Sequence, residues 1–299
     1  MRKIHIAARD GNLTELQKQL MRGVNINVQD KNGLTPLHYA CWSRCKETIK
    51  YLLSKGASPL IREYKNGYNP IEASLLFGDS ETVKMFFRMS NINFKDTIPE
   101  NNFTLLHMAA YKKCASLVKY FIDIGFDVNA RLKEDSELGS TPLLWACQEG
   151  DLQIVKLLVR NGADVNIDDG HATPLYQAVT DFTNPEGRIN LVKYLLKHGA
   201  DINRKFTLHA ACAWNRFEMV KLLLGNGADM EQIDDEGRTP IFYSAMRGHK
   251  KLTQYLISLG ANTGLKDNDG NTIDTIREYY IKTDKELEEL YKERRTKLS

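Results

Sequence analysis

The chain has 299 residues, a formal net charge of +3 and 42% hydrophobic residues. So small a charge gives no electrostatic reason to expect nucleic acid or an anionic membrane as the main partner. No apolar run approaches the roughly 18 residues of a membrane-spanning helix, and the basic N-terminus lacks the apolar core of a signal peptide. We therefore expect no membrane insertion and no nucleic acid as the main partner.

Five cysteines, an odd number without paired spacing, favour a reducing compartment. We expect a cytoplasmic protein, with the nucleus or a host cytosol as alternatives. The spacing of His38, Cys41 and Cys45 is compatible with zinc, but no second cluster supplies the remaining ligand. We expect no metal and no cofactor.

Residues 1–29 read as an N-terminal capping unit. Ile4 to Ala8 matches a helix pattern that recurs along the chain, but no hairpin precedes it. The next helix, Leu13 to Met21, carries polar residues suited to an end that faces water. An end unit of this kind shields the apolar face of the unit that follows it.

The fullest copy of the recurring pattern is Gly139 to Ile167. Thr141 can cap the exposed amides of a helix, and Pro142 suits the first helical position. Gly150 ends this first helix, and a second helix with apolar residues at helical spacing follows from Asp151. The unit is too small to bury its own apolar face, so it must stack on copies of itself.

Copies of the Thr141 slot occur at intervals of 32 to 37 residues. They are Thr35, Asn69, Thr104, Thr141, Thr173, Phe206, Thr239 and Thr272. Fragments such as TPLHYAC, TPLLWAC and TPIFYSA begin the units, and LLVRNGADVN and LLKHGADIN end them. In these motifs the chain resembles the ankyrin-repeat family over nearly its whole length. The resemblance implies a helix–turn–helix and a β-hairpin finger per unit, stacked into an all-α solenoid.

We accordingly expect one ankyrin-repeat domain over residues 1–299. It would hold the capping unit 1–29, about seven repeats over 30–267, and a degenerate C-terminal capping unit with a polar final helix over 268–299. The fingers at 93–104 and 129–141 are longer than the others, and the finger at 203–206 is nearly absent. Surface loops tolerate such changes cheaply, so their functional meaning stays open.

Four histidines share one slot of the first helix: His5, His38, His107 and His209. Residues that recur at one structural position indicate a structural role, and we expect hydrogen bonds between neighbouring turns. Three cysteines, Cys41, Cys147 and Cys212, fill a small apolar slot. The chain contains no phosphate-binding glycine loop, no HExxH and no serine elbow, so we expect no catalytic residues and no enzyme.

The first helices also carry large aromatic residues. The resemblance implies that the positions flanking their small-residue pair face a concave groove. In this chain those positions hold Tyr39, Trp42, Phe77, Tyr111, Lys112, Trp145, Gln148, Glu149, Trp214, Tyr243, Met246 and Arg247. Aromatic anchors dominate binding hot spots, and we favour this role for Trp42, Phe77 and Trp145, whereas Trp214 is a candidate for filling a gap beside the missing finger.

The sequence thus predicts a non-catalytic scaffold, monomeric alone, that binds a partner protein or peptide along the groove. Charged finger tips would tune orientation and rate. These tips are Lys31, Lys65, Glu137, Asp234, Glu236 and Arg238. Two alternatives remain: a regulatory or sensor module that holds a small ligand such as a nucleotide in the groove, and a microbial ankyrin-type effector that acts on host proteins.

Overall fold

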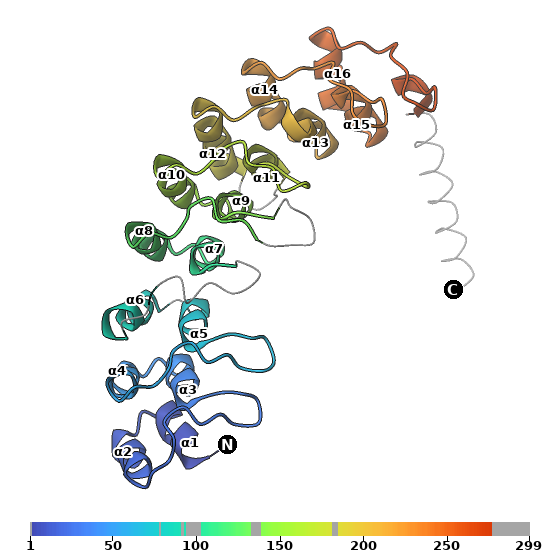
Figure 1. Cartoon of the computed structure of the whole chain (residues 1–299). Helices are drawn as coiled ribbons and strands as arrows, with labels where there is room; N and C mark the ends of the chain where they lie inside the picture. Colours follow the sequence, from blue (N-terminus) through green and yellow to red (C-terminus); the bar gives the residue numbers. More distant parts are fainter. Residues whose placement is uncertain are drawn as a thin grey trace, which may run out of the picture. The chain divides into compact units, whose positions relative to one another are not determined.

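A computed structural model describes residues 2–77, 79–90, 93, 103–132, 139–180 and 185–276, without the side chains of 185–187. The chain divides into two compact units, residues 1–164 and 165–299 (Figure 1). The expected finger tip Glu137 and the expected final helix at 284–298 lie outside the described residues. The single domain over 1–299, with its capping units, stays a prediction.

Unit 1 alternates short first helices with longer second helices. Its first helices have seven or eight residues and its second helices nine or ten. In chain order they are α1 (Lys3–Arg9), α2 (Leu13–Met21), α3 (Pro36–Trp42), α4 (Lys46–Ser54), α5 (Pro70–Leu76), α6 (Ser80–Met89), α7 (Leu105–Tyr111), α8 (Ala115–Asp123), α9 (Pro142–Glu149) and α10 (Leu152–Arg160). Within this unit the first helices form an inner row between the second helices and the fingers (Figure 1).

Unit 2 repeats the same alternation. Its elements are α11 (Pro174–Thr180), α12 (Pro185–Lys197), η2 (Arg204–Phe206), α13 (Thr207–Ala213), α14 (Phe217–Gly225), α15 (Pro240–Met246) and α16 (Lys250–Ser258). The nearly absent finger at 203–206 is the short helix η2. Lys205 and Phe206 adopt the left-handed region there, with φ of 55° and 53°. An all-α solenoid of helix–turn–helix units is therefore confirmed.

Several of the predicted helix starts carry the expected caps. Thr35 accepts a hydrogen bond from the His38 amide, and Pro36 occupies the first helical position of α3. Asn69 caps α5 in the same way, although the third helical residue is Glu72 in place of histidine. The cap of α15 differs, because the buried hydroxyl of Thr239 has no hydrogen-bond partner.

The core lies between the first and second helices of each repeat. Each second helix contributes residues at helical spacing that are fully buried, such as Leu16, Ile49 and Leu158. Burying one leucine or isoleucine side chain contributes about 1.5–3 kcal/mol. Because one repeat offers few such residues, stability depends on stacking with its neighbours.

The recurring histidines join successive repeats, as expected. Nε2 of His5, His38, His107 and His209 lies 3.0–3.3 Å from a backbone carbonyl of the next finger. The Thr35 amide donates to Nδ1 of His38, which leaves Nε2 as the protonated nitrogen. Burial lowers the pKa of His107 to about 4, which keeps its ring neutral near pH 7.

Asparagine side chains add a second set of links between repeats. Asn129 accepts from the Asp164 amide at 2.9 Å and donates to the Gly162 carbonyl at 2.9 Å. In unit 2, Asn166 makes the same pair of bonds one repeat further along, with Asp201 and Gly199. These bonds fix the spacing between consecutive fingers.

The fingers are hydrogen-bonded turns, and the described residues contain no assigned strand. The Asp30 amide donates to the Leu34 carbonyl, and the Asp234 amide donates to the Arg238 carbonyl. Each described finger is closed in this way but is too short for a ladder of paired residues. The expected β-hairpins are thus hairpin turns without strands.

Candidate partner-binding face

Large aromatic side chains are exposed at the ends of the first helices. The exposed fractions are 41% for Trp42, 44% for Phe77, 42% for Tyr111 and 41% for Trp214. In α3 the residues just before Trp42, Ala40 and Cys41, are buried. The Trp42 side chain is turned about 100° from that of Cys41 and about 200° from that of Ala40, which directs Trp42 outward.

Trp42 and Phe77 line a cleft of about 650 Å³ in unit 1. Its floor comes from α3 and α5 and includes Ala73 and Leu76. Its sides are the fingers that precede these two helices. The finger residues on the sides are Lys31, Asn32, Leu34, Glu63, Tyr64, Lys65, Asn66 and Tyr68. The cleft therefore combines an apolar floor with a polar, partly cationic rim.

The two fingers of this cleft are bonded to each other. The Tyr64 amide donates to the Asn32 carbonyl at 2.9 Å. Gly33, at φ 82°, permits this approach, because a Cβ there would lie 2.8 Å from the Tyr64 backbone nitrogen. Glu63 accepts from the amides of Lys65 and Tyr68, which folds the second finger. Burial alone would raise the pKa of Glu63, but these backbone bonds lower it.

Tyr39 connects the finger that precedes α3 to the cleft. Its hydroxyl donates to Asp30 at 2.7 Å, and its ring lies edge-on to Trp42 with centroids 5.6 Å apart. Burial and the bond to Asp30 raise the pKa of Tyr39 to about 12, so the hydroxyl stays protonated as the donor. Tyr39 thus connects a finger to the exposed tryptophan and is itself half-buried.

The other expected groove residues of unit 1 gather on α7 and α9. The ring of Trp145 lies edge-on to Tyr111 at 5.3 Å and near Phe103 at 6.0 Å, and it is only half-exposed. Lys112 lies 5.2 Å above the Tyr111 ring. Gln148 is exposed, and Glu149 pairs with Lys113 at 3.1 Å. Trp145 therefore packs against its aromatic neighbours and is less exposed than Trp42 or Phe77, and its role as a binding anchor stays a prediction.

Unit 2 has a smaller hollow of about 280 Å³ at the matching place. The guanidinium of Arg247 lies 4.8 Å above the Trp214 ring. Tyr243 donates to Asp234 at 2.6 Å, the same finger-to-helix bond that Tyr39 makes in unit 1. Met246 is half-buried. The Trp214 side chain is exposed and lies near the nearly absent finger at 203–206.

The expected finger tips have different surroundings. Lys31 and Lys65 are exposed at the cleft of unit 1, and Glu236 is exposed at the hollow of unit 2. Arg238 instead pairs with the buried carboxylate of Asp267 at 3.2 Å. Arg238 therefore joins two fingers, which leaves little of its charge for a partner.

Sequence analysis missed one residue of the cleft and one residue beside it. Tyr64 is 68% exposed and occupies the finger position that holds Asp30 in the preceding finger, counted back from Gly67 and Gly33. An aromatic residue in an acidic turn slot was the available signal. Arg44 donates to the Phe77 carbonyl beside the cleft, and only the structure shows this bond.

The described residues include no group of three or more His, Cys, Asp or Glu side chains placed to hold a metal ion. Cys41 is buried, which raises the pKa of its thiol to about 12, whereas Cys45 lies at the turn before α4 with Sγ 3.5 Å from the Arg9 carbonyl. None of the described helices has the length and apolar character needed to span a bilayer.

Comparison with known proteins assigns the family. Models of ankyrin repeats match residues 4–97 and 106–206, and a second ankyrin-repeat model matches residues 208–257. The chain belongs to the ankyrin-repeat family. This fold typically serves as a non-catalytic scaffold, and ankyrin repeats generally mediate protein–protein interaction.

Several proteins are similar to this chain. The human transient receptor potential cation channel subfamily A member 1 is 26% identical over 89% of this chain, which spans 28% of the channel. Human Rabankyrin-5 is 29% identical over 54% of the chain, which spans 14% of that protein. A Saccharomyces cerevisiae protein, the probable 26S proteasome regulatory subunit p28, is 27% identical, with 79% of this chain and 90% of p28 covered.

Among solved structures, the ankyrin repeat domain of Bcl-3 shares the fold. Its TM-score is 0.55 at 20% identity, with 81% of this chain and 92% of that domain covered.

Proposed function

We propose that this chain is a non-catalytic scaffold that binds a partner protein or peptide on the first helices and fingers of unit 1. The cleft of Trp42 and Phe77 is the main anchor. The observation that carries the proposal is the exposure of these two rings side by side over a volume that fits several side chains. Aromatic residues of this kind dominate binding energy when a partner covers them.

The surroundings of the cleft support this role. Hydrogen bonds between the two fingers and from Tyr39 to Asp30 hold the walls and floor in place before a partner arrives. Preorganised sites lose less conformational entropy on binding. A relative of similar extent, p28, is named as a regulatory subunit of a larger assembly, which is compatible with a scaffold.

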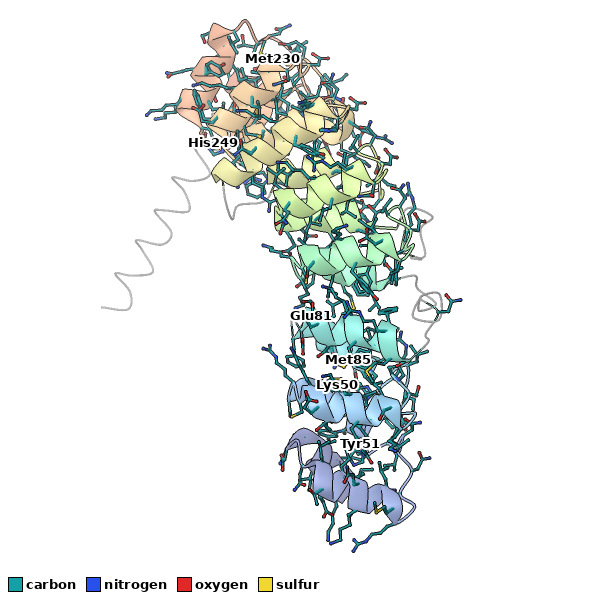
Figure 2. All side chains as sticks on the ribbon, turned by 90° about the vertical axis from the view of Figure 1, so that its left-hand side faces the viewer. Lys50, Tyr51, Glu81, Met85, Met230 and His249 are labelled. Atoms are coloured by element: carbon teal, nitrogen blue, oxygen red, sulfur yellow. The ribbon has the colours of Figure 1, made fainter. Side chains whose placement is uncertain are left out.

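The test uses the full chain as bait in extracts of its native cells, with bound proteins identified by mass spectrometry. Replacing Trp42 and Phe77 together by alanine should remove the specific partners. A matched control is Tyr51→Ala, an aromatic residue on α4 that lies on the face of second helices shown in Figure 2. Circular dichroism checks that both variants keep their helices. Partner capture that is equal for wild type and W42A/F77A would reject the proposal.

A small-ligand sensor predicts a different result. A nucleotide held in the same cleft would raise the melting temperature of the full chain and would lose this effect in W42A/F77A. That outcome would replace the scaffold proposal with the sensor hypothesis.

The five free cysteines agree with a scaffold that works in a reducing compartment such as the cytosol.

A further inference from the structure

Charges on the two faces of unit 1 are arranged differently. On the second helices, three lysines pair with an acid three or four residues away on the same helix. These pairs are Lys50 with Glu47 at 3.5 Å, Lys84 with Glu81 at 3.0 Å and Lys119 with Asp123 at 3.0 Å. Figure 2 shows Lys50 and Glu81 on this face. Much of its charge is balanced locally.

The face of first helices and fingers has cations without such partners. Lys31 and Lys65 stand at the rim of the cleft and form no ion pair among the described residues. Arg44 donates to the Phe77 carbonyl, and Lys112 lies over Tyr111, but neither pairs with a carboxylate in the described part of the chain. Four exposed cations thus lie beside the exposed aromatic rings of unit 1, namely Lys31, Arg44, Lys65 and Lys112.

Among the described residues that line the cleft, Glu63 is the one carboxylate, and it forms no ion pair with Lys31 or Lys65. Glu63 accepts hydrogen bonds from the amides of Lys65 and Tyr68, and its side chain is buried. These hydrogen bonds fold its own finger, and the carboxylate keeps its negative charge. A partner's carboxylates would meet the ammonium groups of Lys31 and Lys65, which have no ion-pair partner among the described residues.

We infer that the cleft of unit 1 takes an acidic peptide segment with a large apolar side chain. The apolar side chain lies on Trp42 and Phe77, and flanking Asp or Glu residues meet Lys31 and Lys65. This inference rests on the proposed function and names the chemistry of its partner. Exposed ion pairs add little affinity each, so the cations mainly select the partner and speed its arrival.

Unit 2 supplies an internal comparison. Counted back from the finger glycine, Lys31, Lys65 and Asp235 occupy one slot, and Asn32, Asn66 and Glu236 occupy the next. Asp235 and Glu236 are exposed and form no ion pair among the described residues. Trp214 already carries Arg247 on its ring. The matching surface of unit 2 therefore has the opposite charge and should not bind the same segment.

The experiment selects binders from a phage library of random peptides of about twelve residues, with the full chain as bait. Selected peptides should have a net negative charge and a large apolar residue. One selected peptide is then synthesised with a fluorophore, together with versions whose acids are replaced by Gln or by Lys. Fluorescence anisotropy measures the affinities at low and high salt.

The acidic peptide should bind at least about tenfold more tightly than its Lys version at low ionic strength. Added salt should reduce this difference in affinity. Lys31→Glu with Lys65→Glu should remove the preference. A control with the same change in net charge is Lys18→Glu with Lys55→Glu, at an exposed position of α2 and at the exposed residue that follows α4, which should keep the preference. Trp214→Ala, with the same exposed fraction as Trp42, should also leave binding unchanged.

Absence of acidic peptides among the selected binders, or a preference that survives K31E/K65E, would overturn the inference. The two proposals can fail separately. If native partners require Trp42 and Phe77 but no acidic preference exists, only the chemistry of the partner is wrong. If W42A/F77A changes neither native capture nor peptide binding, the proposed function is wrong as well.

Discussion

The turn between the two helices of a repeat needs a left-handed residue. Gly11, Gly150 and Gly248 fill this position with φ near 70°, but Arg44 adopts φ 56° and Lys113 φ 55°. A left-handed conformation costs a non-glycine residue about 1–2 kcal/mol. Arg44 is a cation that donates to the Phe77 carbonyl beside the cleft, which is compatible with a role in binding.

We expect Arg44→Gly to raise the free energy of unfolding by about 0.5 kcal/mol, because the relief of strain exceeds the extra flexibility of glycine in the unfolded chain. The same change should weaken binding of an acidic peptide. Urea denaturation and anisotropy measure the two effects. Lys113→Gly is the control, since Lys113 pairs with Glu149 outside the cleft and should leave peptide binding unchanged. A destabilised R44G with normal binding would contradict this account.

The buried histidine of α7 should make stability depend on pH. Burial lowers the pKa of His107 to about 4, whereas an unfolded histidine titrates near 6.5. Between these values the unfolded chain binds more protons, so the stabilisation is complete above about pH 6.5 and is lost as pH falls toward 4. The loss from this one residue amounts to about 3 kcal/mol.

His107→Gln removes this titration. At pH 8 the variant should be less stable than wild type, because the bonds to Thr104 and to the Ser140 carbonyl are weakened. On acidification to pH 4.5 the two unfolding free energies should converge. Parallel pH profiles for wild type and H107Q would show that His107 does not titrate as described.

Single residues also show where sequence reasoning stops. The histidine slot was predictable because one residue type recurs at one position and makes one bond in four repeats. The different surroundings of Trp145 and Trp214 were not predictable, because both residues occupy the same kind of slot in the repeat. Their exposure depends on neighbours: Phe103 and Tyr111 lie against the Trp145 ring, whereas the Trp214 side chain, with Arg247 above its ring, is 41% exposed.

At the scale of elements, the helices follow from local signals and the fingers do not. Apolar spacing, with a Thr-Pro cap at helices such as α3 and α9, predicts the helices without their neighbours. A finger is shaped by the next finger, as the bond from the Tyr64 amide to the Asn32 carbonyl shows. No periodic pattern encodes such a contact, and the expectation of hairpin strands came from the family resemblance alone.

The finger contact can be tested at Gly33. An alanine there would keep φ near 82° only with strain, and its Cβ would meet the Tyr64 backbone nitrogen at 2.8 Å. We expect Gly33→Ala to lower the unfolding free energy by about 1–3 kcal/mol and to weaken peptide binding in the cleft. Gly23→Ala is the control, because its φ is also positive, at 78°, but its Cβ would meet nothing within 4 Å. Equal losses in both variants would exclude a specific role for the finger contact.

At the scale of the molecule, the period of about 33 residues determines the fold, because each repeat must stack to bury its core. The cleft of unit 1 depends on the particular side chains that the stacked repeats carry at this place. Lys31 and Lys65 recur at one finger slot, so their joint presence at the rim was visible in the sequence. Their lack of acidic partners was visible only once the described neighbours were placed around them.

A stack of repeats should respond to damage locally, since each repeat depends mainly on the next. Asn129→Ala removes two hydrogen bonds between consecutive repeats of unit 1, to Asp164 and Gly162. Their loss costs about 1–2 kcal/mol. Amide hydrogen exchange in α7 to α10 should then accelerate roughly tenfold, while α1 to α4 keep their protection.

The matched control for this prediction is Asn161→Ala. The Asn161 side chain bonds only to the Leu157 carbonyl of its own helix among the described residues, so the substitution should accelerate exchange at the end of α10 alone. Exchange that rises uniformly through unit 1 in N129A would indicate one cooperative block instead of coupled repeats. The pattern matters for function, because a cleft built on α3 and α5 keeps its geometry when distant repeats open only if the coupling is short-ranged.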